Sequence, residues 1–242
     1  MRDEPNSNTP DSVFPNNWIS MHSSGELFIY PLAIHNRRLE RRMDIINTLV
    51  NKFNFEVKDL SHHENTEPPQ FLEGTGSMVF DHNYKIAYAA ISSRTNLNLL
   101  QDFSKLIGYS TVPFNAYDKV GAPIYHTNVM MCVGSTFALI GNKTIEKNDY
   151  PKIRDSLLAC NKEIIELSNE QIYNHFAGNM LQLKNKTGET LLVMSQAARD
   201  CLTKKQIERI KKYNDHIVPV GINTIEKIGG GGARCMIAEI FT

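Results

Sequence analysis

The chain has 242 residues, of which 41% are hydrophobic and 21% charged, a composition typical of a folded globular protein. Its 26 Lys and Arg residues balance its 26 Asp and Glu residues, so no net charge draws it toward nucleic acid or an anionic membrane. No apolar run approaches the ~20 residues that cross a bilayer, and residues 1–12 lack the apolar core of a secretion signal. We therefore expect one cytoplasmic domain over residues 1–242, with neither nucleic acid nor membrane as a partner.

The four cysteines are far apart in the chain and form no CxxC pair; they are Cys132, Cys160, Cys201 and Cys235. This spacing favours neither a zinc site nor a disulfide framework. We expect four reduced thiols, no metal and no organic cofactor. The open question is whether one thiol is a nucleophile.

The first half of the chain alternates amphipathic and apolar segments. Apolar residues recur at three- and four-residue steps from His35 to Phe53, which predicts a surface helix. Residues 96–107 predict a second helix, which ends at Gly108. Strands are predicted at 55–60, 78–80, 85–91 and 109–114, with 78–80 and 85–91 as the arms of a hairpin.

The second half continues the same alternation. Ser168 with Gln171 and Thr203 with Gln206 fit capping boxes, each of which predicts the start of a helix. A further helix is predicted at 152–160, and strands at 129–133, 136–140, 163–168, 191–195, 216–220 and 235–241. The alternation of hairpins with single helices indicates an α/β fold, and no Pro/Gly-rich linker divides it.

Four consecutive glycines, Gly229–Gly232, precede Ala233, Arg234 and Cys235. Glycines allow positive φ and close backbone approach, so the loop predicts a thiol at the rim of a strand, beside backbone N–H groups. Such donors lower a thiol pKa and stabilise an oxyanion. A flexible loop with an incidental cysteine explains the pattern equally well. A phosphate loop is less favoured because the Walker lysine and Ser/Thr are missing.

Two further residues have the right chemistry to assist a thiol. His126 precedes an apolar segment, where residues at strand ends commonly face a site, and Glu73 precedes a Gly-Thr-Gly turn. A carboxylate can orient a histidine for proton transfer, provided that the two converge with the cysteine. Cys132 lies within an apolar run and is interpreted as core. The adjacent His62 and His63 point in different directions, which argues against a metal site.

Five segments occur in the order in which a known superfamily carries them: PDSVF (10–14), LEGTGSMVFD (72–81), SSRTN (92–96), HTNVMMCVG (126–134) and GGGGARCMIAEIF (229–241). The chain therefore resembles the guanidino-group-modifying enzymes, which include arginine deiminases, dimethylarginine hydrolases, agmatine deiminases and amidinotransferases. It looks most similar to the citrulline-utilization hydrolase branch, often labelled amidinotransferase-like. The resemblance runs from about Asp11 to Phe241.

This resemblance implies a pentein-type α/β propeller, in which five ββαβ units surround a central substrate pit. Only ten residues precede Asp11, whereas the family carries a further strand–helix–strand stretch there. We therefore expect the chain to lack most of the N-terminal unit and to leave exposed sheet edges.

The resemblance also implies roles for individual residues. Cys235 matches the family's nucleophile, His126 its general acid/base and Glu73 the carboxylate that supports the site. Arg94 matches the arginine that clamps the substrate α-carboxylate, a task suited to a bidentate guanidinium. Asp11 matches the acid that holds the α-amino group.

Two positions depart from the deiminase pattern, because asparagines replace carboxylates at Asn17 and Asn128. A guanidinium offers only donors and a positive charge, whereas a neutral ureido group also offers a carbonyl acceptor. We therefore hypothesise hydrolysis of citrulline to ornithine, ammonia and carbon dioxide, with a small amino acid as the expected partner.

The alternatives are an arginine deiminase or dimethylarginine hydrolase, an amidinotransferase, and a catalytically inactive binding protein or gene fragment. Association into a homo-oligomer stays open at this point.

Overall fold

Four three-stranded sheets are built by one rule in the computed structural model, which describes residues 7–241. In each, two strands form an antiparallel hairpin, and a third strand returns after a helical segment to pair parallel with the second. The last two sheets repeat this pairing. A parallel partner needs such a crossover because a tight turn can join only antiparallel strands. Each sheet with its helical crossover is a ββαβ unit, as predicted.

The first and second units have matching element orders. The first contains β1 (Ile19–Met21), β2 (Glu26–Ile29), α1 (Met43–Phe53) and β3 (Glu56–Asp59). The second contains β4 (Val79–Asp81), β5 (Ile86–Ala90), α3 (Leu97–Ile107) and β6 (Ser110–Phe114).

The third and fourth units differ in their crossovers. The third contains β7 (Met131–Val133), β8 (Phe137–Ile140), α4 (Tyr150–Ala159) and β9 (Glu163–Glu166). The fourth contains β10 (Leu181–Lys184), β11 (Thr190–Ser195), two helices, α6 (Gln196–Cys201) and α7 (Lys204–Lys211), and β12 (His216–Val220).

Shorter elements connect the units. They are the helices α2 (Gly74–Ser77), α5 (Asn169–His175) and α8 (Asn223–Gly229), and the 3-10 turns Pro15–Asn17, His35–Glu40, Ser61–Asn65, Thr127–Val129, Asn142–Thr144 and Ala233–Met236.

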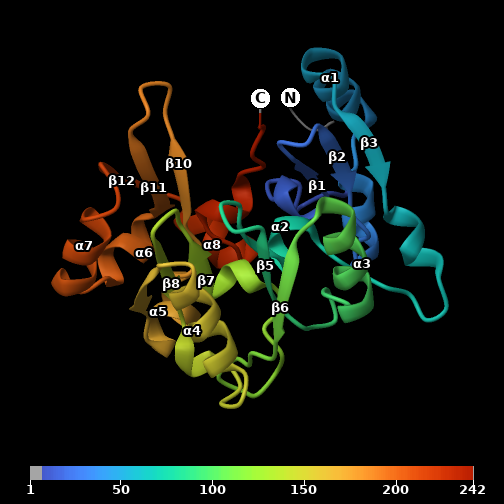
Figure 1. Cartoon of the computed structure of the whole chain (residues 1–242). Helices are drawn as coiled ribbons and strands as arrows, with labels where there is room; N and C mark the ends of the chain where they lie inside the picture. Colours follow the sequence, from blue (N-terminus) through green and yellow to red (C-terminus); the bar gives the residue numbers. More distant parts are fainter. Residues whose placement is uncertain (1–6, 242) are drawn as a thin grey trace.

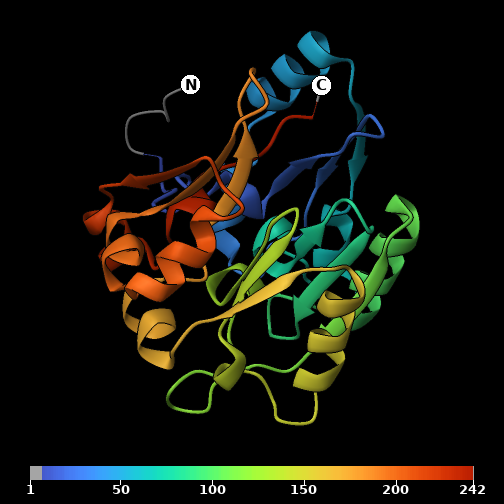
Figure 2. The same cartoon turned by 60° about the vertical axis from the view of Figure 1, so that its left-hand side comes forward.

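The four units follow one another around a centre occupied by α2, α8 and neighbouring turns (Figure 1). After the 60° turn, the fourth unit comes forward and the third lies below it (Figure 2). Residues 7–18 and 230–241 contribute turns and extended chain but no further three-stranded sheet. The arrangement brings the loops between units, rather than the outer helices, to the middle of the molecule.

Helix α3 shows how local sequence fixes an element. The Asn96 side chain accepts hydrogen bonds from the backbone N–H groups of Asn98 and Leu99, while Gly108 ends the helix in the left-handed region. The inner face buries Phe103, whose ring contacts Phe28 edge-on with centroids 5.0 Å apart. Burial of this face fixes the helix on the sheets of the first two units.

Two predictions about elements are wrong in part. The helix predicted from His35 to Phe53 is two pieces, a 3-10 turn and α1, separated by extended backbone at Arg41 and Arg42. Arg41 pairs with Glu64 from another segment. A tertiary contact has therefore overridden the helical periodicity.

The strand predicted at 235–241 does not form, and Cys235 lies in a 3-10 turn instead. Arg234 Nη1 donates to the Ile237 carbonyl at 2.8 Å, and Arg234 Nη2 lies 3.3 Å from Glu239. A side chain thus uses a backbone acceptor that a neighbouring strand would need.

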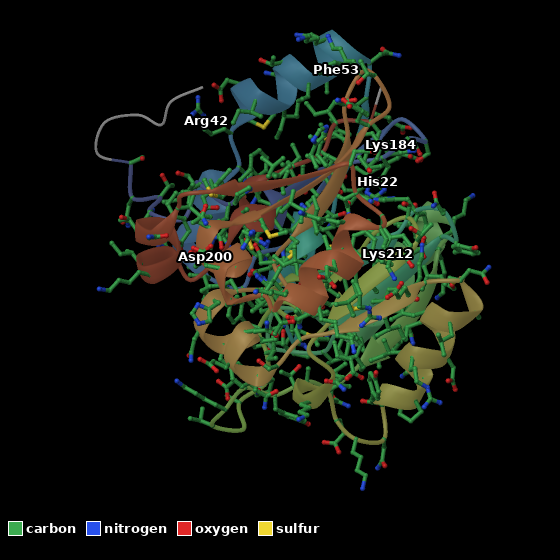
Figure 3. All side chains as sticks on the ribbon, turned by 90° about the vertical axis from the view of Figure 1, so that its left-hand side faces the viewer. His22, Arg42, Phe53, Lys184, Asp200 and Lys212 are labelled. Carbon is green, nitrogen blue, oxygen red and sulfur yellow. The ribbon has the colours of Figure 1, made fainter. Side chains whose placement is uncertain are left out.

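The outer surface carries the polar side chains. In Figure 3, Arg42 and Phe53 mark the two ends of α1 at the top of the view, while Asp200 lies on the fourth unit. No helix within residues 7–241 is both long and apolar enough to span a membrane.

Candidate active site

The segments that carry the candidate residues meet at the centre. Helix α2, which follows Glu73, contacts the turns Pro15–Asn17 and Thr127–Val129. The first of these turns also contacts Ala233–Met236. Residues separated by up to some 220 positions of sequence therefore share one buried region.

His126 and Glu73 form a close polar pair in this region. His126 Nε2 lies 2.7 Å from Glu73 Oε2, and both side chains are buried. The other Glu73 oxygen accepts the Ala33 N–H at 3.0 Å. Arg94 Nη1 and Arg37 Nη1 lie 3.5 and 3.9 Å from Glu73 Oε2. The carboxylate is thus surrounded by donors.

These surroundings fix the protonation of the pair. Burial by itself raises the pKa of Glu73, but the His126 hydrogen bond and the positive charge of Arg94 outweigh burial and lower it. Because an ionised carboxylate only accepts, His126 must carry its hydrogen on Nε2. Burial lowers the pKa of His126, so the imidazole is neutral at pH 7 and leaves Nδ1 as an acceptor.

Two amides hold the Cys235 thiol. Asn179 Nδ2 lies 3.1 Å and Asn128 Nδ2 3.4 Å from Cys235 Sγ. The Cys235 N–H donates in return to Asn179 Oδ1 at 3.2 Å. Burial raises the pKa of the thiol, while both amides oppose this shift. The sulfur is therefore protonated at neutral pH and sits among donors that favour its anion.

The glycine loop is closely packed. Gly230 ends α8 with φ of +69°, which a residue with a side chain rarely adopts. A Cβ at Gly232 would lie 2.9 Å from Asn179 Oδ1, and one at Gly231 would lie 3.0 Å from the Phe14 ring. These contacts favour the close-approach interpretation over a loose loop. Gly232 and Cys235 therefore both lie directly against the Asn179 side chain.

Asn17 belongs to the same region through a buried arginine. Arg37 Nη1 donates to Asn17 Oδ1 at 2.7 Å, and the same guanidinium holds both oxygens of Glu40. The Asn17 Nδ2 group has no hydrogen-bond partner among residues 7–241.

Arg94 and Asp11 lie toward the outside. The Arg94 side chain is 26% exposed, and its guanidinium lies 5.2 Å from the centroid of the Tyr125 ring. The Tyr125 hydroxyl donates to the Gly230 carbonyl, which ties this rim to the glycine loop. Asp11 is half-buried, and its backbone carbonyl accepts from the Phe14 N–H at 2.9 Å.

Sequence reasoning missed Asn179 and Arg37. Asn179 follows Gly178, where a Cβ would lie 2.6 Å from the Val129 carbonyl oxygen, so the Gly-Asn pair was a usable signal of close approach. Arg37 lies in a run of arginines, in which nothing distinguishes a buried guanidinium from solvated ones.

Other features carry no comparable chemistry. Within the described part of the chain, no three His, Cys, Asp or Glu side chains gather as metal ligands. An open groove of about 830 Å³ beside α5 and α6 contains none of the candidate residues. A cavity of about 60 Å³, by contrast, is bordered by Asn128 and Arg234.

A family model described as N,N dimethylarginine dimethylhydrolase, eukaryotic, matches residues 1–242. Comparison with curated proteins gave no match.

Similar solved structures include ArgZ, an arginine dihydrolase from the ornithine-ammonia cycle in Cyanobacteria, with a TM-score of 0.73 and 17% identity over 98% of this chain. The chain spans about a third (34%) of that full-length protein and 80% of its separate N-terminal domain, for which the TM-score is 0.72 at 16% identity.

A dimethylarginine dimethylaminohydrolase bound to 4-chloro-2-hydroxymethylpyridine has a TM-score of 0.65 and 20% identity over 96% of this chain and 79% of its own. The family match covers the whole chain, and the structural likeness confirms the predicted pentein-type arrangement of ββαβ units. The chain therefore belongs to the family of eukaryotic N,N-dimethylarginine dimethylhydrolases, within the guanidino-group-modifying pentein hydrolases.

Proposed function

We propose that this chain is a single catalytic domain that hydrolyses a C–N bond of a small ureido amino acid, with citrulline as the substrate. The observation that carries the proposal is a buried thiol, Cys235, held by two amide donors in the same central region as the neutral His126 imidazole and its Glu73 carboxylate. A nucleophile, a base and a group that orients the base are the parts that covalent hydrolysis requires. The four cysteines are all free, which suits a reducing cytoplasm.

In the first step the Cys235 thiol must lose its proton as it attacks the ureido carbon. Because Cys235 is protonated and His126 is neutral, Nδ1 of His126 accepts the Sγ proton as sulfur bonds to the ureido carbon. Glu73 stabilises the imidazolium that results, through the bond to Nε2. The imidazolium then gives its proton to the departing amino nitrogen, which leaves as ammonia when its C–N bond breaks.

The second step releases the product. Water adds to the same carbon and loses a proton to Nδ1 of His126, after which the C–S bond breaks and the proton returns to sulfur. The N-carboxy product loses carbon dioxide to give ornithine. The sum is citrulline plus water to ornithine, ammonia and carbon dioxide, without a change of oxidation state.

The remaining candidate residues fit the two ends of such a substrate. Arg94 presents a partly exposed guanidinium at the rim, where it can take the α-carboxylate, and Asp11 can take the α-amino group. Asn17 and Asn128 add no negative charge to the buried region. Their neutrality favours a ureido group over a guanidinium.

Hydrolysis of N,N-dimethylarginine is the second candidate, and the family match favours it. It would use the same thiol and imidazole but release dimethylamine and yield citrulline as a product. A catalytically inactive role is less supported because Cys235, His126 and Glu73 all remain.

Purified protein should be offered citrulline, arginine and dimethylarginine separately, with ornithine, citrulline and ammonia measured. We expect ornithine and ammonia from citrulline at the highest rate, and no turnover by a Cys235→Ala variant. Cys201→Ala is the matched control, because this half-buried thiol bonds to the Ala198 carbonyl on α6 and should leave turnover unchanged. Faster release of citrulline from dimethylarginine would contradict the proposal and establish the second candidate.

A further inference from the structure

Arg37 is buried at the centre of the molecule, with 3% of its surface exposed, and all sides of its guanidinium are occupied. Nε and Nη2 donate to the two oxygens of Glu40 at 3.0 and 2.9 Å. Nη2 also faces the Phe14 carbonyl at 3.2 Å, while Nη1 donates to Asn17 Oδ1 at 2.7 Å. This bidentate pairing holds the guanidinium plane in one orientation.

The arginine therefore sets the polarity of the Asn17 amide. A guanidinium has no acceptor, so only the amide oxygen of Asn17 can face it. The Nδ2 group must then point the opposite way. Asn17 is 2% exposed, and among residues 7–241 nothing accepts a hydrogen bond from Nδ2.

The Nδ2 group lies close to the imidazole of His126, beside Gly76. A Cβ built on Gly76 would overlap Asn17 Nδ2 and lie 3.0 Å from both Cε1 and Nδ1 of His126. Glycine at this position thus lets the amide donor and the ring edge that is not bonded to Glu73 lie close to each other. A reacting group that accepts from Nδ2 would therefore lie beside the base.

We propose that Arg37 is a positioning residue that makes Asn17 a fixed hydrogen-bond donor to the reacting group, and so selects an oxygen acceptor over a guanidinium N–H. The inference rests on the proposed function and explains its selectivity. An unconstrained asparagine could turn its oxygen toward a guanidinium. Here Arg37 holds that oxygen, so the reacting end of the substrate meets an N–H, which suits a ureido oxygen and the negative charge that develops on it.

The test is the ratio of kcat/KM for citrulline to that for arginine. Arg37→Met with Glu40→Gln removes the orienting donor without leaving the Glu40 charge unpaired, and the ratio should fall roughly tenfold. Asn17→Asp keeps Arg37 paired but presents only acceptors, and the ratio should fall roughly a hundredfold. Arg38→Met is the matched control, because Arg38 donates to the Leu32 carbonyl instead and the ratio should not change.

A merely structural arginine gives a different pattern. If the Arg37/Glu40 variant lowers turnover of both substrates in parallel, the inference is wrong, although citrulline hydrolysis by the unmodified protein still stands. If the unmodified protein prefers arginine but the variants shift the ratio as stated, the proposed function is wrong and the positioning role stands. An unchanged ratio in Asn17→Asp overturns the inference by itself.

Discussion

Two buried polar regions of this molecule differ in whether their hydrogen-bond donors have partners within the protein. In the second and third units, Lys162 Nζ lies 2.8 Å from Asp81 Oδ2 and donates to the carbonyls of Gly134 and Ser135 at 3.0 and 2.8 Å. This buried ammonium is therefore paired with a carboxylate and hydrogen-bonded to two backbone carbonyls. At the centre, Asn17 Nδ2 and both polar atoms of the Asn16 side chain have none among residues 7–241.

This difference indicates a structural role for the Lys162 cluster and a ligand-binding role for the central cluster. A buried donor that lacks a partner costs free energy, so a chain keeps one only where something compensates for it. The Lys162 cluster joins two units, and its charged donor is paired with a carboxylate of the protein itself. The central cluster instead combines open donors with a thiol and a neutral imidazole, which is the arrangement expected where a ligand supplies the missing partner.

The largest expected effect is on catalysis, from Glu73→Gln. The amide keeps an acceptor for His126 Nε2 but loses the charge that stabilises the imidazolium during proton transfer. We expect kcat to fall roughly a thousandfold, measured as ornithine release, while the melting temperature changes little. A variant that retains more than about a tenth of the activity would remove Glu73 from the mechanism.

The next effect is on stability and should spare the chemistry. Lys162→Met leaves Asp81 buried without its partner, and we expect the free energy of unfolding to fall by about 3 kcal/mol. Urea denaturation measures this loss. Asp81→Asn in the same chain should restore part of it, and kcat of the folded protein should be unchanged.

The matched control is an exposed pair. Lys105 and Asp102 lie 2.9 Å apart on α3 with both side chains largely in solvent, so Lys105→Met should change stability by less than about 0.5 kcal/mol. If Lys105→Met and Lys162→Met lowered the free energy of unfolding equally, the buried pair would contribute no more to stability than the exposed one.

A smaller effect concerns thiol reactivity. Asn179→Ala removes an N–H that stabilises the Cys235 thiolate, so the pKa of the thiol should rise further above its ordinary value. Since only the thiolate reacts, the alkylation rate of Cys235 increases with pH. In the variant, the curve of alkylation rate against pH should be shifted to higher pH. We expect a roughly tenfold slower iodoacetamide reaction at pH 8. Asn185→Ala, on the distant β10–β11 hairpin, should leave the curve in place.

The smallest effect is a helix cap. Ser168 accepts from the Gln171 N–H and completes a capping box at the start of α5. Ser168→Ala should lower the free energy of unfolding by about 1 kcal/mol in urea denaturation, without change in kcat. A measurable loss of activity would mean that α5 affects the centre.

Local signals predicted much of the fold. The hairpin β4–β5 and helix α3, with its Asn96 and Gly108 caps, follow from neighbouring residues alone. Strands β1, β2 and β10 were missed, although strands of the same length, such as β4 and β7, were predicted. The strand predicted at 235–241 does not form. The Arg234 guanidinium donates to the Ile237 carbonyl, which a neighbouring strand would need, and to the Glu239 carboxylate.

The site was predictable only where a motif marks it. Segment order pointed to Cys235, His126 and Glu73, and the structure brings their segments together. Asn179 and Arg37 were not predicted, because each acts on a partner 56 or 20 positions away. Beside Asn179 the only signal was Gly178, and nothing in the residues beside Arg37 distinguishes a buried orienting side chain from a solvated one.

The central claim is that Cys235 becomes covalently bonded to the substrate carbon. Acid quenching during turnover of citrulline, followed by intact-mass measurement and peptide mapping, tests it most directly. The account predicts one substrate-derived group on the peptide that contains Cys235, and none on the Cys235→Ala variant. An adduct on Cys132, Cys160 or Cys201 would contradict it. So would turnover of citrulline by both the unmodified protein and the Cys235→Ala variant with no adduct on either.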